Sequence, residues 1–100
     1  MTTVTADQLQ VCRDYATARC QARKVACRYQ RDEAVRLLDE ARRIFRRADR
    51  ETRRALHPVI AALNDRQDIT DPGMALIAAE IRLEAPAPNY STGWRLEGRA

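Results

Sequence analysis

Apolar side chains recur at helical spacing through the first half of the chain, which has no Gly and no Pro before Pro58. Thr5 and Gln8 have the spacing of a capping box, in which each side chain bonds the backbone N–H of the other residue, so we expect a helix to begin near Ala6. Apolar residues then lie on two sides of this helix: Leu9, Cys12, Ala16, Cys20 and Cys27 on one, and Val11, Tyr15, Ala18, Ala22, Val25 and Tyr29 on the other. Because both sides need cover, we expect the helix to lie between two neighbours.

From Asp32 onward the apolar positions form one face about 120° wide, and the opposite face is charged. This face consists of Ala34, Leu37, Leu38, Ala41, Ile44, Phe45, Ala48, Thr52, Ala55 and Leu56. Two arrangements remain open. In the first, Asp32 caps a new helix after a tight turn at residues 29–31, which gives an antiparallel helical hairpin. In the second, one helix continues through Asp32, as a small residue at every seventh position from Cys20 to Ala62 favours.

Pro58 interrupts the helical pattern because it has no N–H to donate, so it either kinks the helix or begins a new one. Residues 64–68 are polar and predict a helix end. Asp71 followed by Pro72 is typical of a helix start, with Asp71 as the cap, and we expect a last helix from Pro72 to about Glu84. One face of this helix carries Met74, Ile77, Ala78 and Ile81, while Leu76 and Leu83 point elsewhere. We therefore expect the helix to be covered on two sides or to contact a partner.

Residues 1–85 are expected to form a single helical domain, followed by an extended C-terminal arm over residues 86–100. Pro86 and Pro88 impose the extended backbone, and no helical period follows them. Trp94 lies in this arm. Because Trp is enriched at binding hot spots, Trp94 is a candidate anchor that docks on this chain, on its symmetry mate or on a foreign partner.

Composition narrows the fold class. Of the 45% of residues that are hydrophobic, 17 are Ala and 3 are Cys, which leaves 25 large apolar side chains in 100 residues. Three Gly, four Pro and one Ser are too few for the turns of a β protein, whereas the abundant Ala, Arg, Leu and Glu favour helix. We therefore predict an all-α fold: a long amphipathic N-terminal helix or helical hairpin, two shorter helices and the extended arm. So thin a core favours support from a homodimer or a larger partner.

The first residues do not resemble a secretory signal, because residues 1–4 contain no basic side chain and no apolar run follows them. No uncharged stretch is longer than ten residues, and the one from Ala55 to Asn64 is about half the length needed to cross a bilayer. We expect a cytoplasmic chain with no membrane contact. Seventeen of the eighteen basic residues are Arg, which is typical of a GC-rich genome and favours a bacterial or phage source.

Basic residues concentrate between positions 42 and 54, where seven Arg against two acidic residues give a net charge of +5. They are Arg42, Arg43, Arg46, Arg47, Arg50, Arg53 and Arg54. On one continuous helix they project within about 140° of each other, opposite Phe45 and its apolar neighbours. Such a stripe suits the carboxylates of an acidic protein surface or the phosphates of a nucleic acid, since the planar guanidinium binds either group through two parallel hydrogen bonds.

A second interpretation of the same residues needs no partner. Acidic and basic side chains are spaced for i,i+4 pairs along a solvated helix: Asp32 with Arg36, Asp39 with Arg43, Arg47 with Glu51, and Asp49 with Arg53. The stripe also contains no aromatic residue for base stacking, and no helix-turn-helix motif accompanies it. The charge is nevertheless segregated along the chain, because residues 1–57 carry +6 and residues 58–100 carry −2.

Candidate chemistry is sparse. Cys12, Cys20 and Cys27 share a helical face, but at 1.5 Å per residue they lie about 10–12 Å apart along the axis, too far to bind one zinc ion. His57 has no nucleophile motif or Gly-rich loop near it, and the acidic residues between positions 65 and 71 lack the spacing and Gly of a calcium loop. We expect no cofactor, no metal and no enzymatic activity.

The function that fits these patterns is binding. We expect a small non-enzymatic interaction protein of adaptor or inhibitor type, with phages among its candidate sources, that contacts an acidic protein surface through the arginine-rich helix face and Trp94. A DNA- or RNA-binding protein that uses the stripe of residues 42–54 is the alternative, and a virion or scaffold component is the third interpretation. Salt separates these classes, because counterion release makes the affinity for a nucleic acid fall steeply with ionic strength.

Overall fold

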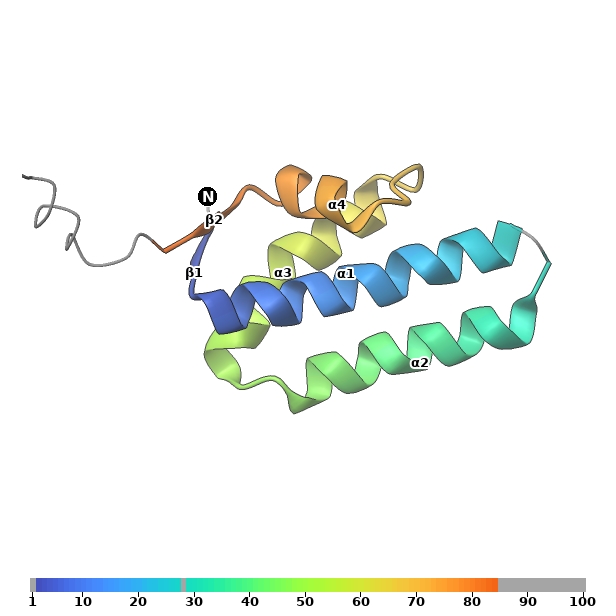
Figure 1. The fold of residues 1–100 in the computed structure, drawn as a ribbon, viewed down its shortest axis with the longest axis horizontal. Coiled ribbons are helices and arrows are strands. Elements are labelled where there is room, and N and C mark those ends of the chain that lie inside the picture. The colour runs from blue at the N-terminus through green and yellow to red at the C-terminus, as the bar shows by residue number, and fades with distance from the viewer. Residues whose placement is uncertain (1, 28, 85–100) are drawn as a thin grey trace, which may run out of the picture.

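The computed structural model describes residues 2–27 and 29–84 and arranges them as four helices with a pair of short strands (Figure 1). Along the chain these elements are β1 (Thr2–Val4), α1 (Ala6–Cys27), α2 (Arg31–Arg47), α3 (Arg50–Asp65), α4 (Pro72–Ala78) and β2 (Ile81–Leu83). The predicted all-α class is confirmed, with a long helical hairpin followed by two shorter helices. The expected arm over residues 86–100, with Trp94, lies outside the described residues.

The capping box at the start of α1 is confirmed. The Gln8 N–H donates to Thr5 Oγ1 at 3.2 Å, and the Thr5 N–H donates to Gln8 Oε1 at 3.0 Å. The N–H groups in the first turn of a helix have no partner within the helix. The two bonds give an acceptor to one of these groups, the N–H of Gln8, and to the N–H of the cap residue, Thr5. The first helix therefore begins at Ala6, as the spacing predicts.

The chain reverses between α1 and α2, so the hairpin is correct and the continuous helix is wrong (Figure 1). The Tyr29 N–H donates to the Ala26 carbonyl and the Gln30 N–H donates to the Val25 carbonyl, both at 3.0 Å. This pair of bonds is the Schellman ending of a helix, whose C′ residue adopts the left-handed region, and Tyr29 has a φ of 62°. Gln30 is the N-cap of α2 and makes no side-chain cap bond. The predicted Asp32 cap is therefore wrong; Asp32 lies in the first turn, where its charge favours the helix dipole.

A second break, which the apolar pattern does not predict, separates α2 from α3. Ala48 has extended backbone angles, φ −69° and ψ 145°, and the Asp49 side chain caps α3 by accepting from the Thr52 N–H at 2.8 Å. Hydrogen bonds from the Thr52 side chain and backbone hold the pKa of Asp49 below its ordinary value. The apolar face expected to reach Leu56 is thus divided between two helices, and Pro58 lies inside α3 without beginning a helix of its own.

The fourth helix begins as predicted and ends earlier. The Asp71 side chain accepts from the Gly73 N–H at 3.3 Å, and Pro72 is the first helical residue. The helix stops at Ala78, and Glu80 then takes a φ of 55°. The chain continues into β2, which pairs in parallel with β1. The opposed residues are Thr2 and Ile81, Thr3 and Arg82, and Val4 and Leu83. The sequence predicts neither strand, because a run of three residues is too short to show a period.

The face that α4 turns to the core differs from the expected one. Ala75, Leu76 and Ala79 are buried, whereas Met74 and Ile77 are 44% and 70% exposed. Because alanine side chains are small, they let this short helix approach α1 and α3 closely. Met74 and Ile77 are left on the surface.

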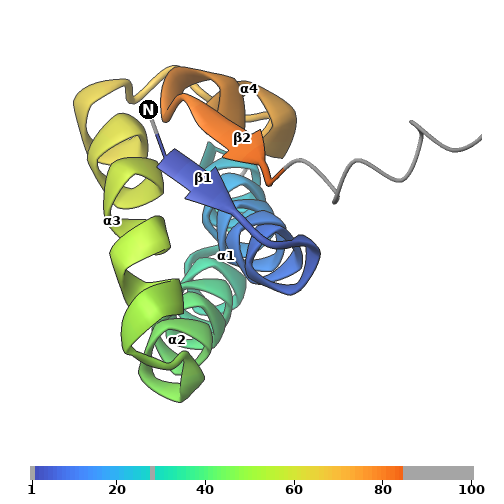
Figure 2. The same cartoon turned by 90° about the vertical axis from the view of Figure 1, so that its left-hand side faces the viewer.

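The first helix is the centre of the fold. α2 packs along it on one side, and α3 and α4 contact it from other directions (Figures 1 and 2). The expected position of α1 between neighbours is therefore confirmed. Its buried side chains are mostly small, and those at most 5% exposed are Cys12, Ala16, Ala18, Cys20 and Ala22. The largest fully buried side chains are supplied by its neighbours: Leu56, Val59 and Leu63 of α3 and Val4 of β1.

Arg23 of α1 connects the end of α3 to the loop before α4. Its guanidinium donates to the carbonyl oxygen of Leu63, to that of Arg66 at 3.0 Å and to that of Ile69 at 2.8 Å. The last carbonyls of a helix have no internal donors, and the helix dipole favours a positive charge beside them. One side chain therefore joins three segments of the fold.

Replacing Arg23 with Met keeps the aliphatic stem and removes all three hydrogen bonds. We expect Arg23→Met to lower the free energy of unfolding by about 2 kcal/mol, because partly buried carbonyls lose a charged donor. Chemical denaturation followed by circular dichroism measures the change. Arg13→Met, at an exposed position of the same helix, is the control and should change the free energy of unfolding by less than about 0.5 kcal/mol. An equal loss in both variants would contradict the role given to Arg23.

Tyr29 provides a test of the turn between α1 and α2. Its side chain is 95% exposed, so removing it loses little packing, while the left-handed backbone costs an L-residue about 1 kcal/mol that Gly does not incur. We expect Tyr29→Gly to raise the free energy of unfolding by about 0.5–1 kcal/mol. Gln30→Gly, at the next exposed residue with a φ of −97°, should lower it. Denaturation curves compare the two variants, and a Tyr29→Gly protein as unstable as Gln30→Gly would exclude the proposed turn.

Candidate binding groove

α2 and α3 diverge from their shared corner while both rest on α1 (Figure 2). A groove follows α2, between α2 and α3 at the corner and between α2 and α1 farther along. Three adjoining hollows of about 580, 260 and 240 Å³ form this groove. Phe45 belongs to the first two hollows, and Tyr15 and Arg42 belong to the last two. We call this surface the basic groove. Its lining residues are Tyr15 and Arg19 of α1, Leu38, Ala41, Arg42, Phe45 and Arg46 of α2, and Arg50, Arg53, Arg54, His57 and Ile60 of α3.

The floor of the basic groove is apolar. Its side chains are the buried Tyr15 and Ala41 and the half-buried Leu38, Phe45 and Ile60. At the corner between α2 and α3, the rings of Phe45 and His57 meet edge to face with their centroids 6.1 Å apart. The floor therefore presents apolar surface of α2 and α3 beside the buried Tyr15 of α1.

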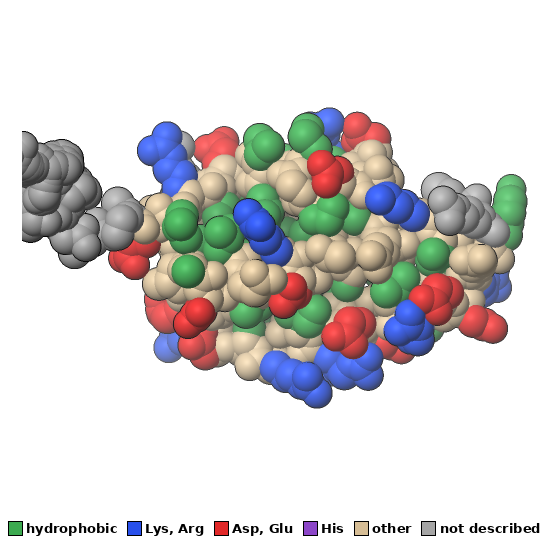
Figure 3. Space-filling view, in the orientation of Figure 1, with side chains coloured by type: hydrophobic (Ala, Val, Ile, Leu, Met, Phe, Trp, Pro, Cys, Tyr) green, Lys and Arg blue, Asp and Glu red, His purple; other side chains and the backbone are tan. Residues whose placement is uncertain are grey.

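Arginine side chains form the rim of the basic groove. Six arginines and one histidine line it, and none of its twelve lining residues is acidic. The face of the molecule drawn in Figure 3 is different, because acidic and basic side chains are interspersed across it. The absence of acidic side chains from the lining thus distinguishes the groove from the face drawn in Figure 3.

The structure brings together most of the arginines that the sequence singles out. Those that line the basic groove are Arg42, Arg46, Arg50, Arg53 and Arg54. Arg43 and Arg47 lie on α2 outside the groove. The expected continuous stripe is wrong, because the helix is interrupted between Arg47 and Arg50. The interruption directs arginines from two helices toward one depression.

The paired acidic and basic residues are spaced differently along the helices from the expected spacing. Among the described residues the intrahelical pairs are i,i+3 and not i,i+4: Arg36 with Glu33, Arg42 with Asp39 at 2.8 Å, Arg43 with Glu40 at 2.7 Å, and Arg54 with Glu51 at 3.9 Å. All of these side chains are largely exposed, and exposed pairs contribute little to stability. An arginine of this kind exchanges its partner for a carboxylate of another molecule at small cost. Arg46 and Arg50 bond to no carboxylate within residues 2–27 and 29–84.

Arg53 has a structural role within the rim. It donates from Nε to the Phe45 carbonyl at 3.1 Å and from Nη2 to the Arg46 carbonyl at 2.6 Å. Its guanidinium carbon also lies 5.5 Å from the centre of the Phe45 ring. Arg53 of α3 therefore satisfies the C-terminal carbonyls of α2 and sets the corner at which the groove begins.

Arg19 sets the other side of the groove. It donates from Nη1 to the Tyr15 hydroxyl and from Nη2 to Asn64 Oδ1, both at 2.8 Å, and so connects α1 to α3. Arg19 is not among the residues that the sequence singles out, because no run of charge surrounds it. The sequence indicates the Arg19–Tyr15 contact only through its i,i+4 spacing, and it contains no signal for the Arg19–Asn64 contact.

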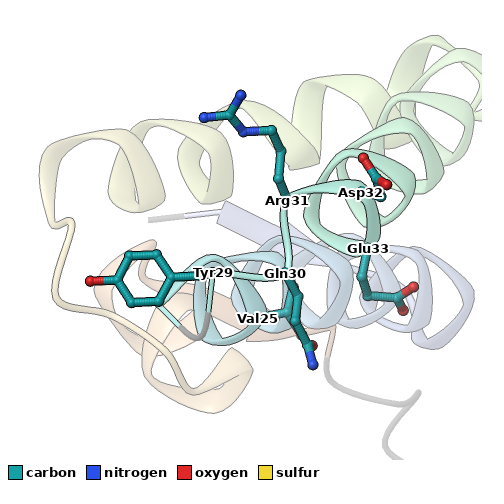
Figure 4. A pocket seen from close by; sticks show the side chains of 6 residues that line it. All are labelled: Val25, Tyr29, Gln30, Arg31, Asp32 and Glu33. Carbon is teal, nitrogen blue, oxygen red and sulfur yellow. The ribbon is translucent and has the colours of Figure 1, made fainter.

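Another hollow, of about 700 Å³, lies at the turn between α1 and α2 (Figure 4). Its lining residues are Val25, Tyr29, Gln30, Arg31, Asp32 and Glu33. The Tyr29 ring points away from the other labelled side chains and into solvent. One basic and two acidic side chains line this hollow, so it offers neither an apolar floor nor charge of a single sign.

The buried thiols supply no nucleophile. Cys12 and Cys20 are both enclosed. Burial raises the pKa of the Cys12 thiol to about 11, and burial also raises the pKa of Cys20. Because the thiolate is the reactive form and the metal ligand, both thiols are inert near neutral pH. In the described part of the chain, no three His, Cys, Asp or Glu side chains are placed to hold a metal ion.

Among the helices of the described residues, none has both the length and the apolar character needed to span a bilayer. Comparisons with models of protein families, with curated proteins and with solved structures find no match to this chain. A functional assignment therefore depends on the basic groove.

Comparing Arg53→Gln with Arg54→Gln tests the structural role of Arg53, because both variants remove one positive charge from the rim. We expect Arg53→Gln to lower the free energy of unfolding by about 1 kcal/mol, because two carbonyls at the end of α2 lose a charged donor. Arg54→Gln, at the next residue, loses only the long contact with Glu51 and should leave stability nearly unchanged. Denaturation in urea compares the two. If both variants are as stable as the original protein, Arg53 does not hold the corner.

Proposed function

We propose that this chain is a small non-enzymatic interaction protein, of adaptor or inhibitor type, that binds an acidic surface of another protein through the basic groove. One observation carries this proposal: twelve residues of three helices enclose an apolar floor within an arginine rim, and none of them is acidic. Charges of one sign held close together repel each other in the free protein, and a partner with carboxylates relieves that repulsion.

The combination of side chains favours a protein partner. The planar guanidinium forms two parallel hydrogen bonds with a carboxylate, and arginine and aromatic residues are enriched where binding energy is concentrated. Arg46 and Arg50 are available for such bonds, and Phe45 and Ile60 supply apolar surface beside them. Adaptors and inhibitors act by occupying a surface of another macromolecule, which requires no catalytic group.

A nucleic acid is the alternative partner for the same arginines. Phosphates would contact the rim and leave the apolar floor in water. The Phe45 ring is already contacted by Arg53 and His57, so it is a poor platform for a stacked base. We therefore favour a protein and treat a nucleic acid as an outcome of the test.

Cytoplasmic location, a phage source and self-association belong to this proposal as expectations from composition. The small core and the exposed Met74 and Ile77 of α4 are reasons to expect a second contact surface. Sedimentation of the purified protein determines whether it is a dimer.

Two double charge reversals on α2 distinguish the groove from its surroundings. R42E/R46E changes two residues that line the basic groove, and R43E/R47E changes their immediate neighbours, which lie outside it. The pairs are matched, because Arg42 and Arg43 each bond an acidic residue three positions earlier, and Arg46 and Arg47 both lie in the last turn of α2. The two variants therefore alter charge and helix stability alike and differ in the face that they alter.

Affinity capture from an extract of the source organism, with and without nuclease, tests the proposal. We expect a protein partner to be captured in stoichiometric amount and to remain bound after nuclease treatment. R43E/R47E should capture the same amount of this partner, and R42E/R46E should capture at least about tenfold less. Circular dichroism first establishes that both variants are folded. A partner lost on nuclease treatment would assign the groove to a nucleic acid, and a protein captured equally by R42E/R46E would show that the groove is not the binding surface.

A further inference from the structure

We propose that the occupant of the basic groove is an acidic amphipathic helix of about three turns, supplied by the partner; this inference rests on the function proposed above. Three features of the groove support it: its shape, its apolar floor and the spacing of its arginines.

The shape of the groove fits a helix. The hollows follow α2 from Leu38 to Phe45 and continue to the corner, and those two residues alone are about 10 Å apart along the helix axis. α2 lines the groove along its whole length, α3 lines the hollow at the corner and the middle hollow, and α1 lines the middle hollow and the hollow at Leu38. A helix laid along α2 in this groove would pack against α3 near one end and against α1 near the other, as ridges into grooves. α4 contacts α1 and α3 and lies away from α2 (Figure 2).

The floor specifies an apolar stripe on the occupant. Leu38, Phe45 and Ile60 are half-buried in the free protein, so each has apolar surface that a partner can cover. Apolar side chains at positions i, i+3 or i+4, and i+7 of a helix face the same way and suit such a floor. An unstructured polyanion would neutralise the rim and leave these three side chains in water.

The arginines specify where the acidic residues of the occupant lie. Arg42 and Arg46 are one turn apart on α2, and side chains at that spacing have Cβ atoms about 6 Å apart. Glu or Asp residues at i and i+4 of a neighbouring helix have the same separation, so two carboxylates can meet two guanidinium groups in register. Arg50 of α3 adds a further guanidinium at the corner. We therefore expect acidic residues at four-residue spacing beside the apolar stripe.

The C-terminal segment of this chain does not have that chemistry. Residues 85–100 contain Arg95 and Arg99 against one acidic residue, Glu97, and two prolines. A net positive charge is repelled by an arginine rim. The complementary helix belongs to another molecule.

A displayed library of random 16-residue peptides tests the inference even while the partner is unidentified. Selection uses the full chain, with counter-selection on R42E/R46E. We expect enriched peptides to be acidic at four-residue spacing and apolar at i, i+3 or i+4, and i+7. A synthetic peptide of the enriched sequence should bind R42E/R46E at least about 30-fold more weakly than the original protein and R43E/R47E within about threefold, as fluorescence anisotropy measures. Its helical circular dichroism should increase on binding.

Several results would overturn the inference. The inference is wrong if the selection enriches no peptide, if the enriched peptides contain no acidic residues, or if they bind R42E/R46E as tightly as the original protein. It is also wrong if a scrambled peptide of the same composition binds equally tightly, because charge alone is then recognised. If the library fails while the captured partner still depends on Arg42 and Arg46, the proposed function stands and the helical occupant is wrong. If both fail, the groove is not the binding surface. A dimer of this chain that R42E/R46E dissociates would assign the groove to a second copy.

Discussion

The small side chains of α1 determine where the other helices lie. Alanine and cysteine residues give α1 no bulky ridge, so α2, α3 and α4 approach it closely from different directions. The larger apolar side chains of α3 and β1 fill the remaining space. Because α2 and α3 both rest on α1, they contact each other little beyond their corner. The basic groove is thus a consequence of how a chain with few large apolar residues assembles its core.

Arginine side chains have two roles in this protein: some bond carbonyls at helix ends, and others contribute charge to the groove. Arg23 and Arg53 face the last carbonyls of a neighbouring helix, which need donors, and each joins elements that the thin core leaves weakly connected. The arginines on the groove side of α2 face no such acceptors: Arg42 has an exposed acidic partner, and Arg46 has none among the described residues. Their charge is therefore available to another molecule without loss of the links that hold the fold.

The sequence predicted correctly those helix starts that depend only on residues within one or two helical turns. The capping box of Thr5 and Gln8 and the start at Asp71 are of this kind. Asp49 carried a similar signal, but the apolar period continues through it unchanged and hid the break. The groove was beyond local reasoning, because it is lined by residues of three helices, from Tyr15 of α1 to Ile60 of α3. Sequence spacing identified the arginines, and only the tertiary structure separates the ones at the groove from Arg43 and Arg47.

The pairing of β1 with β2 has a consequence for the order in which the chain folds during synthesis. Thr2–Val4 leave the ribosome before any helix of the described fold, yet their partners, Ile81–Leu83, are among the last of the described residues to emerge. The helical hairpin can associate as soon as α2 is complete, since its contacts are close in sequence. Val4, which is 1% exposed in the finished fold, stays without its strand partner until translation has passed residue 83. Closure of the parallel ribbon is therefore a late step, because it joins two segments whose synthesis is separated by all four helices.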